Sequence, residues 1–329
     1  MRTFLKLLLL ALLAAGAWLA WMLLVPYGPG IEKFVLLRPG SSVRHIAADL
    51  HSAGVVRNVP AFLLLHYARG EKILKAGEYR FDHPATALEV YDRLVHGDVI
   101  THTVVIPEGL SQFEIAAAVE AAGLTTREQF LQVARTETAL VSDLDPAATS
   151  LEGYLFPDTY QFSRVQSPRD LAAAMVRRFR QEAQALGLSS DVRRVVTLAS
   201  IVEKETSVPE ERAVVAGVYS NRLQKGMVLA ADPTVAYAAQ LAGRYRGTIY
   251  KSDLEFDSPY NTYRNAGLPP GPIANPGRAA LEAALKPAAT DYYYFVSDNH
   301  GAHRFARTER EHVRNVAAYR RAVAREGSR

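Results

Sequence analysis

The sequence predicts an α+β protein in which an N-terminal transmembrane helix precedes a small α/β module and a larger α+β domain. Three observations lead to this prediction. Residues 7–25 form an unbroken apolar run, long enough to cross the hydrocarbon core of a bilayer as a helix. A strand–turn–helix pattern occurs twice, at residues 36–55 and 105–124. Residues 192–205 have the apolar spacing of an amphipathic helix.

The composition is that of a globular protein with a substantial core. The chain has 329 residues, of which 49% are hydrophobic and 22% charged, enough for two or three domains. Its 38 basic and 34 acidic residues leave a formal net charge of +4, and the arginines are scattered along the chain. This pattern argues against nucleic-acid binding. The absence of cysteine excludes disulfides, thiolate metal sites and cysteine nucleophiles.

The ends of the apolar run predict its orientation in a membrane. Basic residues precede the run and aromatic residues lie toward its far end: Arg2, Lys6, Trp18, Trp21 and Tyr27. Since basic residues stay on the cytoplasmic side, we expect a cytoplasmic N-terminus and the rest of the chain outside. A cleaved signal peptide is the alternative, because residues 15–17 (AGA) resemble a cleavage site. Hydrophobicity continues well past that site, which favours a retained anchor.

The repeat is visible in the sequence alone. Six positions of the first copy match the second at one offset (109 − 40 = 69): Gly40, Ile46, Ala47, Leu50, Ala53 and Gly54. Each copy predicts a strand that ends in a Pro/Gly turn, followed by a short helix closed by a glycine. A second apolar helix follows each copy, near residues 62–65 and 130–131.

The first copy predicts a small module of its own. It continues into a returning strand at 74–81 and a helix at 87–96, which together predict a βααβ unit with a third helix. The opening of this unit resembles that of the LysM domain, a module that lies on glycan strands containing N-acetylglucosamine. A purely structural unit that holds the rest of the chain away from the membrane is the alternative. The predicted parts are 1–30 (tip, anchor and linker), 31–98 (module), 99–150 (second repeat and connector) and 151–329.

The last part predicts helices and one hairpin around long loops. Helices are expected at 171–186, 192–205, 208–225 and 309–324, and a hairpin from strands at 291–296 and 303–306. Between 226 and 277 the chain is rich in turn residues. Long irregular loops of this kind often carry binding groups.

Two glutamates stand out on the helix at 192–205. The apolar stripe of this helix comprises Val192, Val195, Val196, Ala199 and Val202. Glu203 and Glu205 lie on the two shoulders of the stripe, whereas Thr197 and Ser200 take the opposite face. Ser207 followed by Glu210 predicts a capping box for the next helix.

Glu205 would then lie in the last turn of its helix. The helix dipole there penalises negative charge, and partial burial does the same, so both raise the pKa of the carboxyl group. A general acid that works near neutral pH needs such a raised pKa. The alternative is that both glutamates are surface residues paired with Lys204, Arg193 or Arg212.

Other catalytic arrangements find little support. His300 and His303 lie near Asp298, but two histidines in a turn are too few for a typical metal site. Ser200 and Lys204 are one helical turn apart, as in some Ser–Lys hydrolases, yet no oxyanion-hole glycine motif accompanies them. Phosphate-loop and dinucleotide fingerprints are absent. We therefore expect no metal and no cofactor.

Several motifs, in order, carry a resemblance to a known family. They are EGYLFPDTY at 152–160, ASIVEKET at 199–206, NRL at 221–223, DPT at 232–234, YNTY at 260–263, GLPPGPI at 267–273 and YFV at 294–296. Together they resemble the endolytic murein transglycosylases, the MltG/YceG-like family. The resemblance covers nearly the whole chain, including the N-terminal span.

This resemblance implies a lyase activity on peptidoglycan. The enzyme would cut the β-1,4 bond between N-acetylmuramic acid and N-acetylglucosamine within a strand and leave a 1,6-anhydromuramoyl end. The motif match places the catalytic glutamate at Glu205, with Glu203 as an orienting or structural acid. Sugar-binding or supporting roles are expected for Glu152, Tyr154, Asp158, Tyr160, Ser200, Asp232, Asn261 and Tyr263. Asp232 before Pro233 can also be read as a simple turn.

The resemblance also implies a location and partners. We expect a single-pass inner-membrane protein whose catalytic domain, 151–329, is periplasmic. It would act on glycan strands beside peptidoglycan synthases and limit the length of new strands. The alternatives are a hydrolytic muramidase, which would leave reducing ends, and a non-catalytic glycan-binding scaffold for cell-wall synthases.

Overall fold

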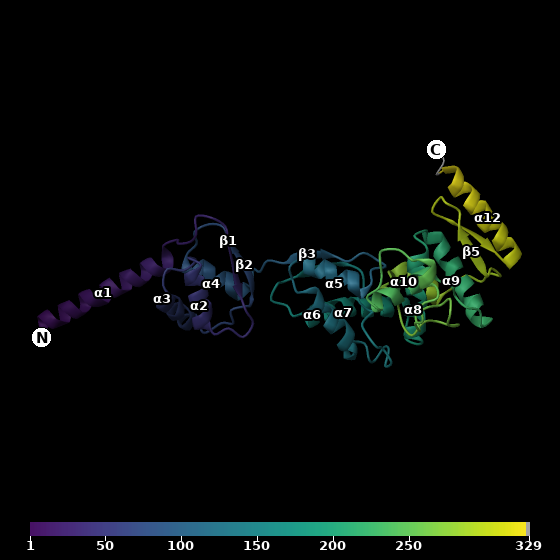
Figure 1. The fold of residues 1–329 in the computed structure, drawn as a ribbon. Helices are drawn as coiled ribbons and strands as arrows, with labels where there is room; N and C mark the ends of the chain where they lie inside the picture. The colour runs from purple at the N-terminus through teal and green to yellow at the C-terminus, as the bar shows by residue number, and fades with distance from the viewer. Residues whose placement is uncertain (327–329) are drawn as a thin grey trace. The chain divides into compact units, whose positions relative to one another are not determined.

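The computed structural model describes residues 1–326 and has an α+β fold with three two-stranded sheets (Figure 1). The chain forms two compact units. The first comprises Met1–Thr103 and Gln161–Ser167, and the second comprises Val104–Tyr160 and the chain from Pro168 onward. The chain passes between the units in β3 (His102–Val105) and β4 (Thr159–Phe162), which pair with each other. The predicted α+β class is confirmed.

The N-terminal apolar run forms one continuous helix, α1 (Arg2–Leu24). Its mean hydropathy is 2.4, and none of its residues is buried. By length and composition it is able to span a membrane, as predicted from the sequence. A signal sequence at the same place would have the same properties.

The first unit contains the predicted βααβ module. Its elements are β1 (Lys33–Leu37), α2 (Val43–Ser52), α3 (Val59–Ala68), β2 (Gly77–Phe81) and α4 (Ala87–His96). The two strands are antiparallel, with Val35 opposite Tyr79 and Leu37 opposite Gly77. Val35 and Leu37 are buried while Phe34 and Leu36 are exposed, so one face of this small sheet covers the core.

A buried carboxylate holds a distant segment in this unit. Glu78 is only 4% exposed and accepts hydrogen bonds from His102 Nε2 at 2.7 Å and Arg164 Nη1 at 2.8 Å. A buried carboxylate is tolerated when it is paired in this way. The contact explains why Gln161–Ser167 belongs with the first unit.

The second copy of the repeat folds in the same order, as β3, α5 (Gln112–Ala121) and α6 (Arg127–Thr136). The turn glycines Gly40 and Gly109 have φ angles of 78° and 79°, a left-handed conformation that favours glycine. This copy, predicted as the second repeat and connector at 99–150, belongs from Val104 onward to the second compact unit. The reason is tertiary packing, because α6 packs against α7 (Pro168–Leu186) and Gly109 N donates to Asn275 O at 2.9 Å.

The helix α8 (Val192–Glu205) lies at the centre of the second unit and has the predicted bounds. It packs against α9 (Pro209–Gln224), α10 (Asp232–Leu241) and α11 (Arg278–Leu285). Part of its predicted polar face is also buried, since Thr197 is 1% exposed and Ser200 is fully buried, whereas Lys204 is exposed. The prediction of a polar opposite face was therefore wrong there, because neighbouring elements surround the helix.

Two further expectations differ from the structure. The stretch after residue 226 contains α10 and α11, which the turn-rich sequence did not lead us to predict; Asp232 and Pro233 open α10. Proline suits a first helical turn because its missing N–H has no partner there in any case. The predicted Ser207–Glu210 capping box is absent. The N-cap of α9 is Val208, whose N–H donates to Thr206 Oγ1 at 3.1 Å.

The C-terminal part forms the predicted hairpin and helix. Strands β5 (Tyr294–Ser297) and β6 (His303–Ala306) are antiparallel, with Ser297 opposite His303. Helix α12 (Glu309–Glu326) packs against both strands (Figure 1). Short 3₁₀ turns occur at Thr138–Leu140 and Lys251–Asp253.

Candidate active site

Glu205 is the last residue of α8 and lines a cavity of about 500 Å³. The cavity walls come from separate parts of the second unit: the end of α8, α9, the start of α10, the hairpin β5–β6 and α12. The carboxylate therefore lies at a helix end beside a hollow of the size that ligand sites have. The position at the helix end that was predicted for Glu205 from the sequence is confirmed.

The surroundings of Glu205 favour its protonated form. Burial raises the pKa of Glu205 to about 7, and the negative charge of Asp232 acts in the same direction. A hydrogen bond from Tyr219 and nearby positive charge, including that of Arg222, act in the opposite direction. Burial has the largest effect, so the carboxyl group can hold a proton near neutral pH and still release it.

Two residues of α9 contact the site. Tyr219 holds Glu205, and Arg222 holds backbone segments beside the cavity. The hydroxyl of Tyr219, a fully buried side chain, donates to Glu205 Oε1 at 2.8 Å. Arg222 lies about one turn further along α9 and donates to Tyr293 O at 2.6 Å and Leu229 O at 2.7 Å. The guanidinium group thus joins the residue before β5 to the segment before α10, in which Leu229 lines the cavity.

Asp232 and Tyr263 share the cavity wall with Glu205. The Tyr263 hydroxyl donates to Asp232 Oδ1 at 2.6 Å, and both side chains are exposed. The preceding Ala230 has a left-handed φ of 49° and donates its N–H to Thr262 O at 3.0 Å. A non-glycine residue in this conformation is strained, and here it adjoins the candidate site.

Four predicted site residues are instead buried among protein groups: Glu152, Tyr154, Ser200 and Asn261. Glu152 accepts from Gln112 N at 3.0 Å and from Asn275 Nδ2 at 2.7 Å, and burial raises its pKa to about 8. Asn261 donates to the carbonyl groups of a nearby loop and accepts from Tyr263 N at 3.0 Å. Side chains enclosed in this way are out of reach of a sugar in this structure.

Tyr154 and Ser200 show the same pattern. The hydroxyl of Tyr154 donates to Asp145 Oδ2 at 2.6 Å. Ser200 Oγ donates to Thr197 O at 2.7 Å and accepts from Ile273 N at 3.1 Å. Lys204 Nζ donates elsewhere, to Gly109 O, so the geometry speaks against a Ser–Lys dyad.

Three other predicted residues lie outside the cavity. Glu203 accepts from Gly277 N at 2.9 Å and forms an ion pair with Arg212 at 3.5 Å, so the pairing expected under the alternative interpretation applies to this glutamate. Asp158 is bound by Arg178 at 2.5 Å, and the Tyr160 hydroxyl donates to Phe156 O at 2.6 Å.

Sequence reasoning did not assign a site role to several residues that line the cavity, including Tyr219, Arg222, Phe295, His303 and His312. Arg222 and Phe295 lie in motifs that carry the resemblance, and His303 was considered only as a metal ligand. Among residues 1–326 no cluster of three or more potential metal ligands exists. Tyr219 gave no signal, because an aromatic residue on a helix usually packs in a core.

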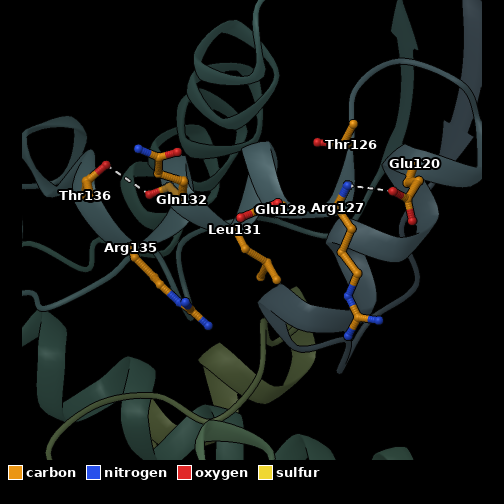
Figure 2. A pocket seen from close by; sticks show the side chains of 8 residues that line it. All are labelled: Glu120, Thr126, Arg127, Glu128, Leu131, Gln132, Arg135 and Thr136. Carbon is orange, nitrogen blue, oxygen red and sulfur yellow. Dashed lines mark hydrogen bonds between the residues drawn. The ribbon is translucent and has the colours of Figure 1, made fainter. Parts of the chain in front are cut away.

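A larger hollow, of about 630 Å³, lies beside α6 on the same unit (Figure 2). It is lined by Glu120, Thr126, Arg127, Glu128, Leu131, Gln132, Arg135 and Thr136. Both acidic and basic side chains line it. The Glu120 carboxylate accepts a hydrogen bond from Arg127 N at 2.9 Å. It contains no predicted site residue. We therefore regard the smaller cavity at Glu205 as the candidate active site.

Comparisons with known proteins agree with the sequence motifs. Residues 35–318 match the model of the YceG-like family. The chain is 34% identical over 302 residues to a Bacillus subtilis protein named endolytic murein transglycosylase, covering 85% of this chain and 82% of that protein. It is 30% identical over 349 residues to a Streptococcus pneumoniae protein of the same name, covering 94% of this chain and 63% of that protein.

A solved structure is also similar. The crystal structure of a YceG-like protein from Listeria monocytogenes matches with a TM-score of 0.57 and 32% sequence identity. The match covers 87% of this chain and 99% of that chain.

Proposed function

Since this chain belongs to the YceG-like family, we propose that it is an endolytic murein transglycosylase with Glu205 as its catalytic residue. The relatives named above carry this activity in their names. The observation that carries the proposal is the Glu205 carboxyl group, which lines a cavity and has a pKa of about 7. A scaffold without catalysis would have no use for such a group.

One carboxyl group can perform both halves of the reaction. Protonated Glu205 gives its proton to the glycosidic oxygen as the bond from C1 of N-acetylmuramic acid to that oxygen breaks. The 6-hydroxyl of the same sugar then bonds to C1, and its proton passes to the Glu205 carboxylate. No water is consumed, and the products are a 1,6-anhydro end and a free 4-hydroxyl group. The Tyr219 hydrogen bond would orient Glu205 for both proton transfers.

A hydrolytic muramidase is the second candidate, and Asp232 is the observation that favours it. This carboxylate lies on the same cavity wall as Glu205, and inverting and retaining glycosidases use a second carboxylate to activate water or bond to C1. Its oxygen is engaged by Tyr263, at 2.6 Å. That contact suits a residue that positions the sugar, and we retain the transglycosylase as the main proposal.

Product analysis separates these candidates. The full-length protein in detergent is incubated with peptidoglycan in H₂¹⁸O, and the fragments are analysed by mass spectrometry. A transglycosylase yields anhydro ends without ¹⁸O, a muramidase yields reducing ends that contain it, and a scaffold yields neither. We expect Glu205→Gln to reduce product formation by at least about 100-fold, the scale of general acid catalysis.

Glu203→Gln is the matched control. Its carboxylate contacts Gly277 and Arg212 outside the cavity, so we expect this variant to retain product formation if it folds. Full activity of Glu205→Gln, with loss in Glu203→Gln, would move the catalytic assignment to Glu203.

The proposed location of the protein and its binding to glycan strands depend on the anchor and the first unit. We propose a single-pass inner-membrane protein with a cytoplasmic N-terminus and a periplasmic catalytic part. The βααβ module of the first unit would bind N-acetylglucosamine-containing glycan in the manner of LysM domains, with a structural spacer as the alternative. Cleavage beside peptidoglycan synthases would then limit the length of new strands. Asp232 and Tyr263 would bind the sugar, whereas Glu203, Glu152, Tyr154, Asp158, Tyr160, Ser200 and Asn261 would support the fold around the site.

A further inference from the structure

A second polar residue of the Glu205 cavity is held in a defined orientation by an unusual pair of contacts. Glu211, in the first turn of α9, bonds to His303 at the start of β6. Its Oε1 accepts from His303 N at 2.8 Å, and its Oε2 lies 2.7 Å from His303 Nδ1. The His303 and Glu211 side chains are only 12% and 14% exposed. One carboxylate thus fixes both the backbone and the ring of His303.

These contacts determine the hydrogen-bonding role of each ring nitrogen. An ionised carboxylate only accepts hydrogen bonds, so Nδ1 carries a proton and donates it to Glu211. In the neutral ring, Nε2 is then an acceptor. Nε2 makes no hydrogen bond within residues 1–326, and it is not among the polar atoms that are buried without a partner. It is therefore accessible, and His303 lines the cavity.

The ring has little freedom to turn away from this position. Phe295 packs against it edge to face, with ring centroids 5.3 Å apart at 87°, and Phe295 in turn packs edge to face on Tyr219 at 5.7 Å. Tyr219 is the residue that holds Glu205. Glu205 and His303 are thus set in one cavity by a continuous chain of contacts from α8 to β6. A purely structural histidine would need the contacts to Glu211 but not an accessible nitrogen without a partner.

We propose that His303 is a substrate-binding residue, whose Nε2 accepts a hydrogen bond from a hydroxyl group of the pyranose ring next to the bond that Glu205 protonates. The inference rests on the proposed function for the identity of the ligand as a glycan. Glu211 is a positioning residue in this arrangement, since it acts by fixing the tautomer and direction of His303. His303 would thus be a third sugar-binding residue beside Asp232 and Tyr263, and it comes from the hairpin β5–β6.

Two replacements of His303 separate binding from structure. In His303→Asn the side-chain amide can replace Nδ1–H and keep the bond to Glu211, but nothing occupies the place of Nε2. In His303→Gln the longer side chain can put a carbonyl oxygen near that place. We expect His303→Asn to keep the melting temperature of the wild type and to lose roughly tenfold or more in kcat/KM, the scale of one hydrogen bond. His303→Gln should recover part of that loss.

The same variants are also compared in the Glu205→Gln background, where the readout is binding. The probe is a peptidoglycan tetrasaccharide of alternating N-acetylglucosamine and N-acetylmuramic acid, measured by calorimetry on the full-length protein in detergent. We expect Asn at position 303 to weaken its binding about tenfold, and Gln to weaken it less. This measurement does not depend on which bond-breaking reaction the enzyme performs, so it tests His303 even where the product analysis contradicts the transglycosylase.

Three results would overturn the inference. The first is wild-type kcat/KM and binding in His303→Asn. The second is an Asn variant that performs better than the Gln variant, since this would show that only the bond to Glu211 matters. The third is a fall in melting temperature that accounts for the whole loss in both variants.

Discussion

At the scale of single residues, opposing effects set the pKa of the Glu205 carboxyl group. Burial and the charge of Asp232 raise its pKa, while the Tyr219 hydroxyl and nearby positive charge, including that of Arg222, lower it, and the result is about 7. A carboxyl group much more strongly buried would not release its proton, and an exposed one would not keep it near pH 7. Both proton transfers of the proposed reaction need a value between these limits.

The Tyr219 hydrogen bond makes a testable contribution to this value. Tyr219→Phe removes the donor at 2.8 Å from Glu205 Oε1 and keeps the ring that packs on Phe295. Since the bond stabilises the carboxylate, its loss raises the pKa of Glu205. The alkaline limb of kcat/KM should therefore move to higher pH by roughly one unit, from about 1.5 kcal/mol for a hydrogen bond to a charged group.

The control for this measurement is Tyr154→Phe. It removes an equally buried hydroxyl that donates to another carboxylate, Asp145, away from the cavity. Its alkaline limb should stay at the wild-type pH. An unchanged limb in Tyr219→Phe, or an equal movement in both variants, would contradict the assigned role of Tyr219.

The raised pKa of Glu205 also predicts how stability depends on pH. In the unfolded chain the pKa is near 4.5, and in the folded protein it is about 7. The folded state therefore binds the proton more tightly, and the stability from the protonated group is fully present below about pH 4.5 and lost as pH rises through about 7. Glu205→Gln cannot ionise. We therefore compare the free energy of unfolding of this variant with that of the wild type. The difference, variant minus wild type, should increase by on the order of 2 kcal/mol from pH 5 to pH 8.

Denaturant unfolding at several pH values measures this difference. Glu152, with a pKa raised to about 8, also titrates in this range. Because both proteins contain Glu152, its effect cancels in the difference between them. A difference that is the same at pH 5 and pH 8 would mean that Glu205 has an ordinary pKa in the folded protein.

At the scale of elements, the buried helix α8 depends on a close approach by a loop. Gly153 has a left-handed φ of 87°, and a Cβ atom there would lie 2.5 Å from Pro272 Cγ and 2.8 Å from Val196 Cγ1. The helix and the two loops therefore meet without room for a side chain. This packing fixes α8 against the loops that contain Gly153 and Pro272.

This close approach predicts a large effect of a single methyl group. Gly153→Ala adds about 1–2 kcal/mol of left-handed strain and a further ~1–3 kcal/mol of overpacking. Gly267→Ala is the matched control, because Gly267 has a φ of 93° and a Cβ atom added there would meet nothing within 4 Å. Denaturant unfolding should show a greater loss for Gly153→Ala, and equal losses would contradict the packing argument.

At the scale of the whole molecule, the chain combines an apolar helix with two compact units. The helix α1 exposes large apolar side chains along its length, such as Leu9, Leu12 and Leu13 at 59%, 62% and 62%. An exposed apolar surface of this extent is typical of a segment that contacts lipid. It also contacts the first unit at its end, where Arg57 lies over the ring of Trp21 at 4.6 Å.

Removal of the anchor tests the membrane proposal. The full-length protein should remain with the membrane fraction after a high-salt wash and be released only by detergent. A variant without residues 2–25 should be recovered in the soluble fraction and retain turnover of soluble glycan fragments, because the Glu205 cavity lies in the second unit. A mature chain that begins near residue 18 and is soluble would instead establish a cleaved signal sequence.

The sequence by itself determined the features that depend on local pattern. The bounds of α8, the repeat with its turn glycines, the βααβ module and the hairpin β5–β6 were all predictable. Each follows from periodicity or from a glycine at a turn, signals that act over a few residues. The motif at 199–206 also predicted Glu205 as the catalytic residue, and the motifs at 232–234 and 260–263 predicted Asp232 and Tyr263, which line the same cavity.

Only the tertiary structure decided which groups meet Glu205 and which are sealed in the core. Nothing near Tyr219 or His303 in the sequence relates them to Glu205, because they come from α9 and β6 and reach the cavity by packing. Burial of Thr197 and Ser200 likewise required that the segments around α8 enclose its polar face. The physical reason is that hydrogen bonds and desolvation depend on the distance in space between groups far apart in the chain, which local patterns do not record.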